Sequence, residues 1–479
     1  MLLLRDLIYL YQIFIKLTAM IPRIKSISSA ALILFVTAIF FIRCSTQNED
    51  VQPSLITPEN ALSMYLNNSD ETYEWELKNS LHISDVMVYD LLLTSQKWHD
   101  YSWKHQLTIF IPDAAMYDEA LLWITGGSIE NDNPRWTSGL DEEALAFVIL
   151  ASNNQAVTAI LRQTPNQPLF NGLTEDALIS YTLNNFRNDG DYSWPLLFPM
   201  VKSAVRAMDA IQEFSVEEES LNITGFLVSG ASKRGWTTWL TAASDDRVRA
   251  IAPAVIDILN MPVNLDYQLE VWGDYSEEIQ AYVDLGIPQD VNTPLGADIA
   301  TMIDPYSYLN LLTMPKMIFI GTNDPYWPVD AIKHYFDDLP GENYIHYVAN
   351  AGHDLNGGEE AIPAIGAFFF NTISNQTYPD CSWEVTETGT DMILNVTGSS
   401  GMIQAAYLWS ASSLDRDFRD EEWNSTNLDL TDNSMVDTII DYPLEGFRAF
   451  YVDLKYEDLI NGDYTISTRM FVADEDEIL

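Results

Sequence analysis

An α/β fold, with a mostly parallel sheet covered by helices on both faces, is the class that the sequence predicts. Three short apolar runs, at residues 120–125, 248–258 and 316–320, are continuous rather than alternating, as in strands that are buried on both faces. Helical periodicity, for example at residues 199–214, separates such runs. From about residue 379 short β-like segments follow one another without helices. We therefore expect an α/β domain followed by a β-sandwich-like domain.

The elements of the first domain follow in chain order. After a polar linker, residues 73–112 carry β-rich, period-two stretches, which predict antiparallel strands at one edge of the sheet. The run at 120–125 ends in a glycine loop. Residues 142–151 then predict a helix and residues 156–161 a strand. Residues 344–348 predict the last strand before a helix at 361–371.

Two insertions interrupt this alternation, at residues 166–194 and 259–300. Both are too long for plain connections, and insertions above a parallel sheet usually form lids or pocket walls. The predicted α/β-hydrolase-like domain spans residues 47–378 with these insertions. The β-sandwich-like domain spans residues 379–479.

Residues 1–46 read as a leader that contains a signal peptide. An apolar run at 29–42 follows Arg23 and Lys25, which is the pattern of a secretory signal, so we expect a secreted, extracellular protein. The alternative is a signal anchor in the membrane, because Arg43 follows the run and no clean cleavage site is present. Five sequons would permit glycosylation: Asn67, Asn222, Asn375, Asn395 and Asn424.

The charge of the chain restricts its partners. Seventy Asp and Glu residues against 24 Lys and Arg residues give a formal net charge of −46. Such a charge argues against nucleic acid and against anionic membrane surfaces after removal of the signal segment. The expected partner is a small-molecule or peptide substrate.

A candidate nucleophile lies at the corner between a strand and a helix. Ser232 follows the apolar run at 225–228 and precedes a Trp-containing helical segment, as the serine of a nucleophile elbow does. Gly230 fits this motif, but Arg234 replaces the usual second glycine and Gly235 comes one place late. An ordinary glycine turn is the alternative interpretation.

A histidine and an acid complete the arrangement. Asp324 directly follows the strand at 316–320, and His353 follows the strand at 344–348. Serine, acid and histidine at the ends of successive strands is the chain order of the α/β-hydrolase triad. Asp304 and Asp330 are competing acids. In the alternative interpretation Asp324 is a turn former before proline, and the histidine lies on the surface.

The neighbours of Ser232 predict how an oxyanion would be bound. The backbone N–H of Lys233 follows the nucleophile, and Gly127, in the glycine loop after residues 120–125, could supply a second donor. An ordinary strand-ending turn is the alternative for Gly127. The cations of Lys233 and Arg234 either recognise a carboxylate of the substrate or pair with nearby acids, namely Asp245 and Asp246.

Several segments resemble the PhoPQ-activated pathogenicity-related family, from about residue 60 to the end. They read LLWITGGS, SWPLLFPMVKSAVRAMDA, VSGASKRGWTTWL, DPYSYLNLLTMPKMIFIGTNDPYWPVDA and VANAGHDL. The resemblance implies an α/β-hydrolase-like fold with Ser232, Asp324 and His353 at the triad positions. It also implies a second interpretation, because the family includes an autocrine repressor of proliferation.

The leading hypothesis is a secreted serine hydrolase, of esterase or peptidase type, that works through an acyl-enzyme and needs no metal or organic cofactor. Trp194, Trp236 and Trp327 would then line its substrate pocket. The alternative is a non-catalytic secreted signalling factor that binds a cell-surface receptor. In that case the three tryptophans are inherited scaffold or core.

Overall fold

The computed structural model describes residues 55–399 and 402–479, and Ile56–Leu479 form one compact unit. The predicted signal peptide lies outside the described residues. Among the residues that the structure describes, no helix combines the length and the apolar character that a membrane span requires.

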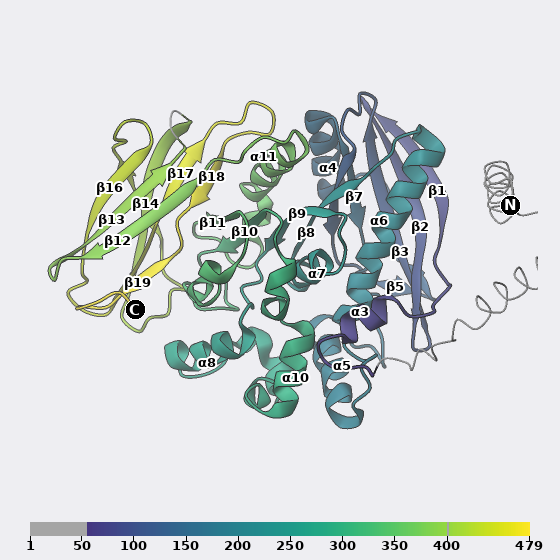
Figure 1. The fold of residues 1–479 in the computed structure, drawn as a ribbon, viewed down its shortest axis with the longest axis horizontal. Helices are drawn as coiled ribbons and strands as arrows, with labels where there is room; N and C mark the ends of the chain where they lie inside the picture. Colours follow the sequence, from purple (N-terminus) through teal and green to yellow (C-terminus); the bar gives the residue numbers. More distant parts are fainter. Residues whose placement is uncertain (1–54, 400–401) are drawn as a thin grey trace, which may run out of the picture. The chain divides into compact units, whose positions relative to one another are not determined.

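One large mixed sheet organises the molecule (Figure 1), in the order β1-β2-β3-β7-β4-β8-β9-β10-β11-β18-β17-β14-β15, with β19 paired to β17. The six strands in the middle of this sheet, which follow one another as β7-β4-β8-β9-β10-β11, are parallel to one another. They are β7 (Val157–Leu161), β4 (Glu119–Ile124), β8 (Gly225–Ala231), β9 (Val248–Ala254), β10 (Lys316–Gly321) and β11 (Asn343–Val348). The antiparallel edge is formed by β1 (Glu74–Ile83), β2 (Val86–Trp98) and β3 (Tyr101–Pro112). The predicted α/β class is confirmed.

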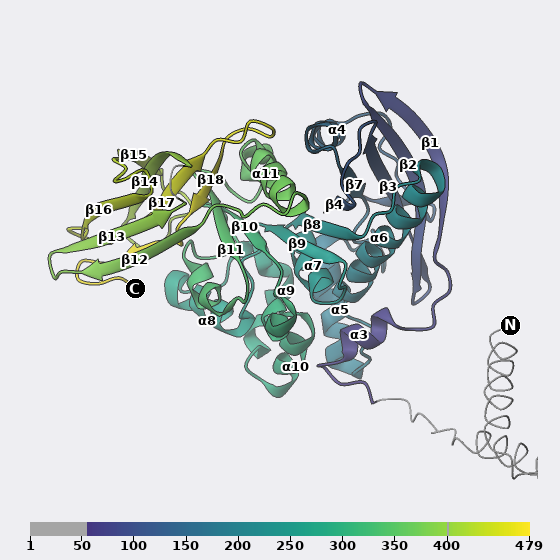
Figure 2. The same ribbon diagram turned by 45° about the horizontal axis from the view of Figure 1, so that its top comes forward.

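The middle strands are continuous apolar runs because helices cover both faces of the sheet (Figure 2). On one face lie α4 (Glu142–Asn154) and α11 (Ala361–Ile373), and on the other lie α6 (Leu197–Glu219) and α7 (Lys233–Ala242). Neighbouring residues of one strand join different cores: Leu227 packs with the α4 and α11 side, and Val228 with the α6 and α7 side. Burial of both faces follows from this arrangement.

The two insertions fold into helices that lie on the same side of the sheet (Figures 1 and 2). The first contains α5 (Glu175–Asp189), and the second contains α8 (Met261–Trp272), α9 (Gln280–Val283) and α10 (Pro294–Ile303), with 3₁₀ turns between them. A short helix, α3 (Ala61–Leu66), begins the described chain and was not expected from the sequence.

The C-terminal strands form two sheets that pack against each other. The smaller sheet contains β12 (Cys381–Glu387), β13 (Asp391–Gly398) and β16 (Met435–Asp441), and the other strands are β14 (Ile403–Ser413), β15 (Asn424–Leu428), β17 (Phe447–Tyr456), β18 (Tyr464–Ser467) and β19 (Phe471–Ala473). Leu394 of β13 and Val452 of β17 meet in one buried core. The second sheet continues the main one, because β18 pairs with β11 at Ile345 and Ser467. The domain boundary at residue 379 stays a prediction.

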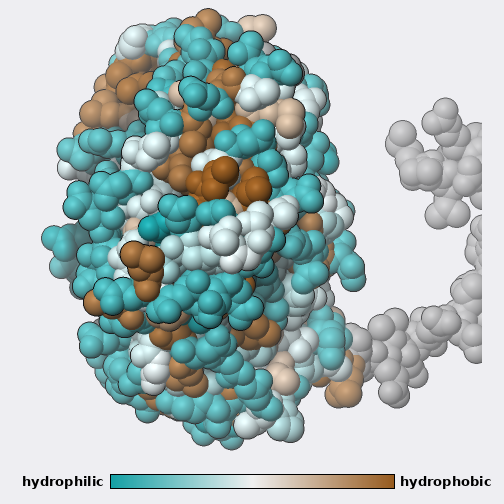
Figure 3. Space-filling view, turned by 90° about the vertical axis from the view of Figure 1, so that its left-hand side faces the viewer, coloured by the Kyte–Doolittle hydropathy of each residue, from teal (hydrophilic) through white to brown (hydrophobic). Residues whose placement is uncertain are grey.

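The surface at the C-terminal end of the molecule is predominantly hydrophilic, with hydrophobic residues in smaller groups (Figure 3). Four of the five sequon asparagines are exposed, and Asn395 is half-buried on β13. Cys381 carries a free thiol.

Candidate active site

Ser232 occupies a strained corner between β8 and α7. Its φ of 58° and ψ of −128° place a non-glycine residue in a region that L-residues seldom adopt. The backbone holds it there, because its N–H donates to the carbonyl of Ala254 at 2.8 Å and its carbonyl accepts the N–H of Trp236 at 2.9 Å. The side chain does not cap α7. The hydroxyl is therefore half-exposed at the end of the strand, as a nucleophile elbow requires.

Two glycines permit this corner, and the structure explains the late position of the second. A Cβ on Gly230 would lie 2.9 Å from the backbone of Arg234, and a Cβ on Gly235 would lie 2.9 Å from the carbonyl oxygen of Gly230. Strand and helix thus approach each other through positions 230 and 235. Arg234 points away from this contact and donates from Nε to the carbonyl of Thr164 at 2.6 Å.

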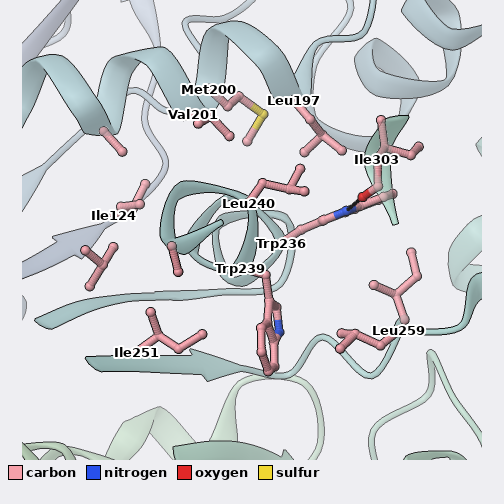
Figure 4. Packing of buried hydrophobic residues seen from close by; sticks show 14 of the residues in the cluster. Ile124, Leu197, Met200, Val201, Trp236, Trp239, Leu240, Ile251, Leu259 and Ile303 are labelled. Carbon is pink, nitrogen blue, oxygen red and sulfur yellow. Dashed lines mark hydrogen bonds between the residues drawn. The ribbon is translucent and has the colours of Figure 1, made fainter. Parts of the chain in front are cut away.

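Tightly packed apolar side chains fix helix α7 behind the serine (Figure 4). Trp239 and Leu240 are fully buried among residues of α6 and the sheet. Trp236 points toward α10, where its Nε1–H donates to the carbonyl of Ile303 at 2.5 Å. The position of Ser232 is therefore set by the core as well as by its own backbone.

Asp324 and His353 are hydrogen-bonded to each other at the ends of neighbouring strands β10 and β11. The distance between Nδ1 of His353 and Oδ2 of Asp324 is 2.8 Å. The other oxygen of Asp324 accepts the N–H of Tyr326 at 3.0 Å. The ring of Tyr326 stacks on the imidazole, with a centroid distance of 4.1 Å. An ionised carboxylate only accepts, so Nδ1 carries the proton and Nε2 presents its lone pair.

One cavity, of about 70 Å³, brings the predicted residues together. Ser232, Lys233 and His353 line it, together with Trp236 and Trp327. Nε2 of His353 is buried and has no hydrogen-bond partner in the described part of the chain. A histidine with one nitrogen oriented by a carboxylate and the other free, in the cavity that a strained serine lines, has the parts of a general base.

Three predicted residues do not line this cavity: Asp324, which is bonded to His353 behind the wall, Trp194 and Gly127. Trp194 does not line it, because its ring packs against His99 and Phe170 and its Nε1–H donates to Asp189 at 2.9 Å. Gly127 lies in the loop after β4, the strand beside β8, but it is not part of the cavity wall. Its carbonyl accepts from the side chain of Gln167 at 3.2 Å.

The cations beside the serine are paired with the first insertion, not with Asp245 and Asp246. Nζ of Lys233 lies 3.0 Å from Glu175 and 3.2 Å from Asp176, and Arg234 binds both oxygens of Glu175. Burial alone would raise the pKa of Glu175, but hydrogen bonds and charge from Arg234 and Lys233 lower it to about 2. Asp245 instead binds Arg247.

Sequence reasoning missed Glu175 and Tyr326. Tyr326 could have been suspected, because it stands two residues after the predicted acid and the N–H at that distance often binds an Asp side chain. Glu175 lies 59 residues before Arg234 and carries no local signal of that pairing.

Serine, acid and histidine follow β8, β10 and β11, in the chain order of the α/β-hydrolase triad. The model of the family of PhoPQ-activated pathogenicity-related proteins matches residues 62–419. The chain belongs to this family, which confirms the resemblance seen in its motifs.

Among curated proteins, the chain is similar to Autocrine proliferation repressor protein A of Dictyostelium discoideum, with 31% identity over 449 residues, 86% of this chain and 90% of that protein. Among solved structures, it is similar to acetyl xylan esterase 1 from Thermoanaerobacterium sp. JW/SL YS485, with a TM-score of 0.46 and 15% identity over 66% of this chain and 93% of that one. The acetyl xylan esterase from Paenibacillus sp. R4 gives a TM-score of 0.42 and 13% identity over 65% and 92%.

Proposed function

We propose that this protein is a secreted serine hydrolase that cleaves an ester or amide bond through an acyl-enzyme. The observation that carries the proposal is the pairing of His353 with Asp324 at 2.8 Å, while Nε2 of His353 has no hydrogen-bond partner in the described part of the chain and His353 lines the same cavity as Ser232. Asp324 orients the imidazole, His353 acts as the base, and Ser232 is the nucleophile.

In the first half of the reaction, Oγ of Ser232 attacks the carbonyl carbon of the substrate while Nε2 of His353 takes the hydroxyl proton. The resulting oxyanion would be held by the N–H of Lys233, at the free N-terminus of α7, and by an N–H of the glycine loop at Gly127. The imidazolium then gives its proton to the leaving oxygen or nitrogen, and the acyl group stays on Ser232. Water then attacks the acyl carbon while Nε2 takes its proton, the bond between that carbon and Oγ of Ser232 breaks, and the imidazolium returns the proton to Oγ as the acid is released.

An ester is the less demanding substrate, because an alkoxide leaves more readily than an amine. A peptidase remains the second possibility within this class. The predicted signal peptide supports secretion, and so does the similarity to a relative named as an autocrine factor.

A non-catalytic secreted regulator is the second candidate function. The observation that favours it is the 31% identity with Autocrine proliferation repressor protein A over 86% of this chain. In this alternative the chain binds a cell-surface receptor on a hydrolase scaffold, and the serine does no chemistry.

A fluorophosphonate probe distinguishes the hydrolase from the non-catalytic regulator, because it phosphonylates only an activated serine. We expect the folded wild-type protein to be labelled and Ser232→Ala to lose the label. Ser244→Ala is the matched control, since this serine lies just beyond the other end of α7 and bonds only the carbonyl of Leu240. Absence of label in wild-type protein whose fold is verified by circular dichroism would favour the regulator.

A further inference from the structure

The cavity that Ser232 lines is small and apolar, and side chains from both insertions contribute to its wall. Six of its nineteen lining residues are isoleucines: Ile256, Ile258, Ile279, Ile287, Ile299 and Ile303. Leu183 comes from the first insertion, and Met261 and Leu265 come from the second. β-Branched side chains have few rotamers, so the side chains of this wall can move little to make room for a larger acyl group.

The charged groups of this wall are already paired within the protein. Lys233, whose side chain is 8% exposed, lies between Glu175 and Asp176. Asp176 also accepts the hydroxyl of Tyr282 at 3.0 Å. No charge is left over to neutralise a charged substrate group, and burying such a group without a partner is costly. The cavity therefore disfavours carboxylate and ammonium groups alike.

Its position decides which part of a substrate enters it. The acyl carbon becomes bonded to Oγ of Ser232, so the acyl chain must lie in a cavity that Ser232 lines. A second, larger cavity, of about 630 Å³ between α4 and α11, also reaches His353, but its wall includes Ala231 and not Ser232. The small cavity is thus the one that faces the acyl chain.

Its size limits that chain. About 70 Å³ is less than half of the roughly 150 Å³ that a dry, apolar protein cavity needs to hold benzene. We propose that this cavity is an acyl pocket for a short, uncharged acyl group of about two to four carbons. This inference rests on the proposed hydrolase function and names its substrate class: esters of short aliphatic acids.

The test is a chain-length series of p-nitrophenyl esters, from acetate through butyrate to octanoate, with Ser232→Ala as the background. We expect kcat/KM of the wild-type protein to be highest for acetate or butyrate and at least about tenfold lower for octanoate, because a single methylene that a hydrophobic pocket does not fit already changes kcat/KM about tenfold or more. Ile299→Ala and Ile279→Ala, on separate elements of the wall, should each raise kcat/KM for octanoate relative to acetate.

Ile211→Ala is the matched control, since Ile211 is equally buried on α6 but does not line the cavity. It should leave the chain-length profile unchanged. A wild-type profile that is flat or rises toward octanoate would contradict the proposal of a short acyl pocket. If Ser232 is still labelled by the fluorophosphonate, the proposed hydrolase function stands. If no ester is cleaved at all, the pocket proposal falls, and the labelling result decides separately whether the hydrolase falls with it.

Discussion

The two nitrogens of His353 lie in different surroundings, and the proposed chemistry depends on that difference. Nδ1 is bound to the buried carboxylate of Asp324, whereas Nε2 has no partner in the described part of the chain. Tyr326 adds a second restraint, because it binds Asp324 through its backbone and stacks on the imidazole through its ring. The tautomer and the direction of the base are thus fixed before any substrate arrives.

Replacing this carboxylate tests its orienting role. Asp324→Asn keeps the size of the side chain but can present an N–H to Nδ1, which favours the wrong tautomer. We expect the rate of fluorophosphonate labelling, and kcat/KM for any cleaved ester, to fall by about a thousandfold or more. Asp354→Asn is the control, because this exposed neighbour of His353 binds only the N–H of Asn356. Equal rates in the two variants would contradict the assignment of Asp324.

At the scale of elements, the loops that bear the acid and the base are held by the C-terminal strands. The docking loop, residues 418–423, is the last part of the connection between β14 and β15. The side-chain amide of Asn323 donates to three of its carbonyls, those of Phe418, Arg419 and Glu421, at 3.3, 3.1 and 2.8 Å. Asn350 exchanges two hydrogen bonds with the backbone of Trp423. The C-terminal strands therefore support the site from behind.

The substitution Asn323→Ala tests how strongly the docking loop stabilises the active-site loops. In Asn323→Ala three partly buried carbonyls lose this donor, and an unmet acceptor costs about 1 to 3 kcal/mol where it is fully buried. We expect Tm to fall by several degrees and kcat, rather than KM, to fall about tenfold, because the neighbouring Asp324 shifts.

The control is Asn371→Ala, which removes a single bond to the carbonyl of Ala367 within α11, away from both loops. It should lower Tm without changing kcat. A variant at 323 that is as active as this control would show that the docking loop has no influence on the site.

The predictable elements were those whose signal is local. Strands β4, β9 and β10 are continuous apolar runs, so both their existence and their parallel packing could be read from the sequence. Ser232, Asp324 and His353 could be found because each directly follows such a strand. The antiparallel edge was visible as well, through its β-rich stretches.

The parts of the fold and of the site that could not be predicted depend on contacts between distant segments of the chain. Strand β15 is polar and mostly exposed, so its composition resembles that of a loop. The alternation in β16 was available but was overlooked. The pairing of β18 with β11 joins residues 122 positions apart and has no local signature. Trp194 was placed at the pocket by its aromatic type alone, and its partners include rings of the first insertion and His99 in the turn between β2 and β3.

At the scale of the whole molecule, the excess of acidic residues extends into the core. In three of the buried carboxyl groups, burial raises the pKa to about 7: Asp257, Asp304 and Asp453. For Asp257, the nearby charges of Asp324 and Asp330 act in the same direction. These groups keep a proton in the folded state that the unfolded chain releases above its ordinary pKa of 3.8. Between these two values, stability falls as the pH rises.

Asp453→Asn isolates one of these groups. Its oxygen accepts the hydroxyl of Ser467 at 2.6 Å, a bond that an amide oxygen can keep. We expect Tm of the wild-type protein to decrease from about pH 4 to about pH 7, and the variant to lose several degrees less over the same interval. Asp429→Asn, at an exposed position, should follow the wild-type curve. A steeper loss in Asp453→Asn would contradict a protonated carboxyl at this site.

The central claim is that Ser232, Asp324 and His353 act as one catalytic unit, and a crystal structure of the fluorophosphonate-treated protein tests it most directly. The account predicts phosphorus bonded to Oγ of Ser232, with Nε2 of His353 and the N–H of Lys233 each within about 3 Å of the adduct's oxygens. An unmodified serine, or an imidazole turned away from the adduct, would contradict it.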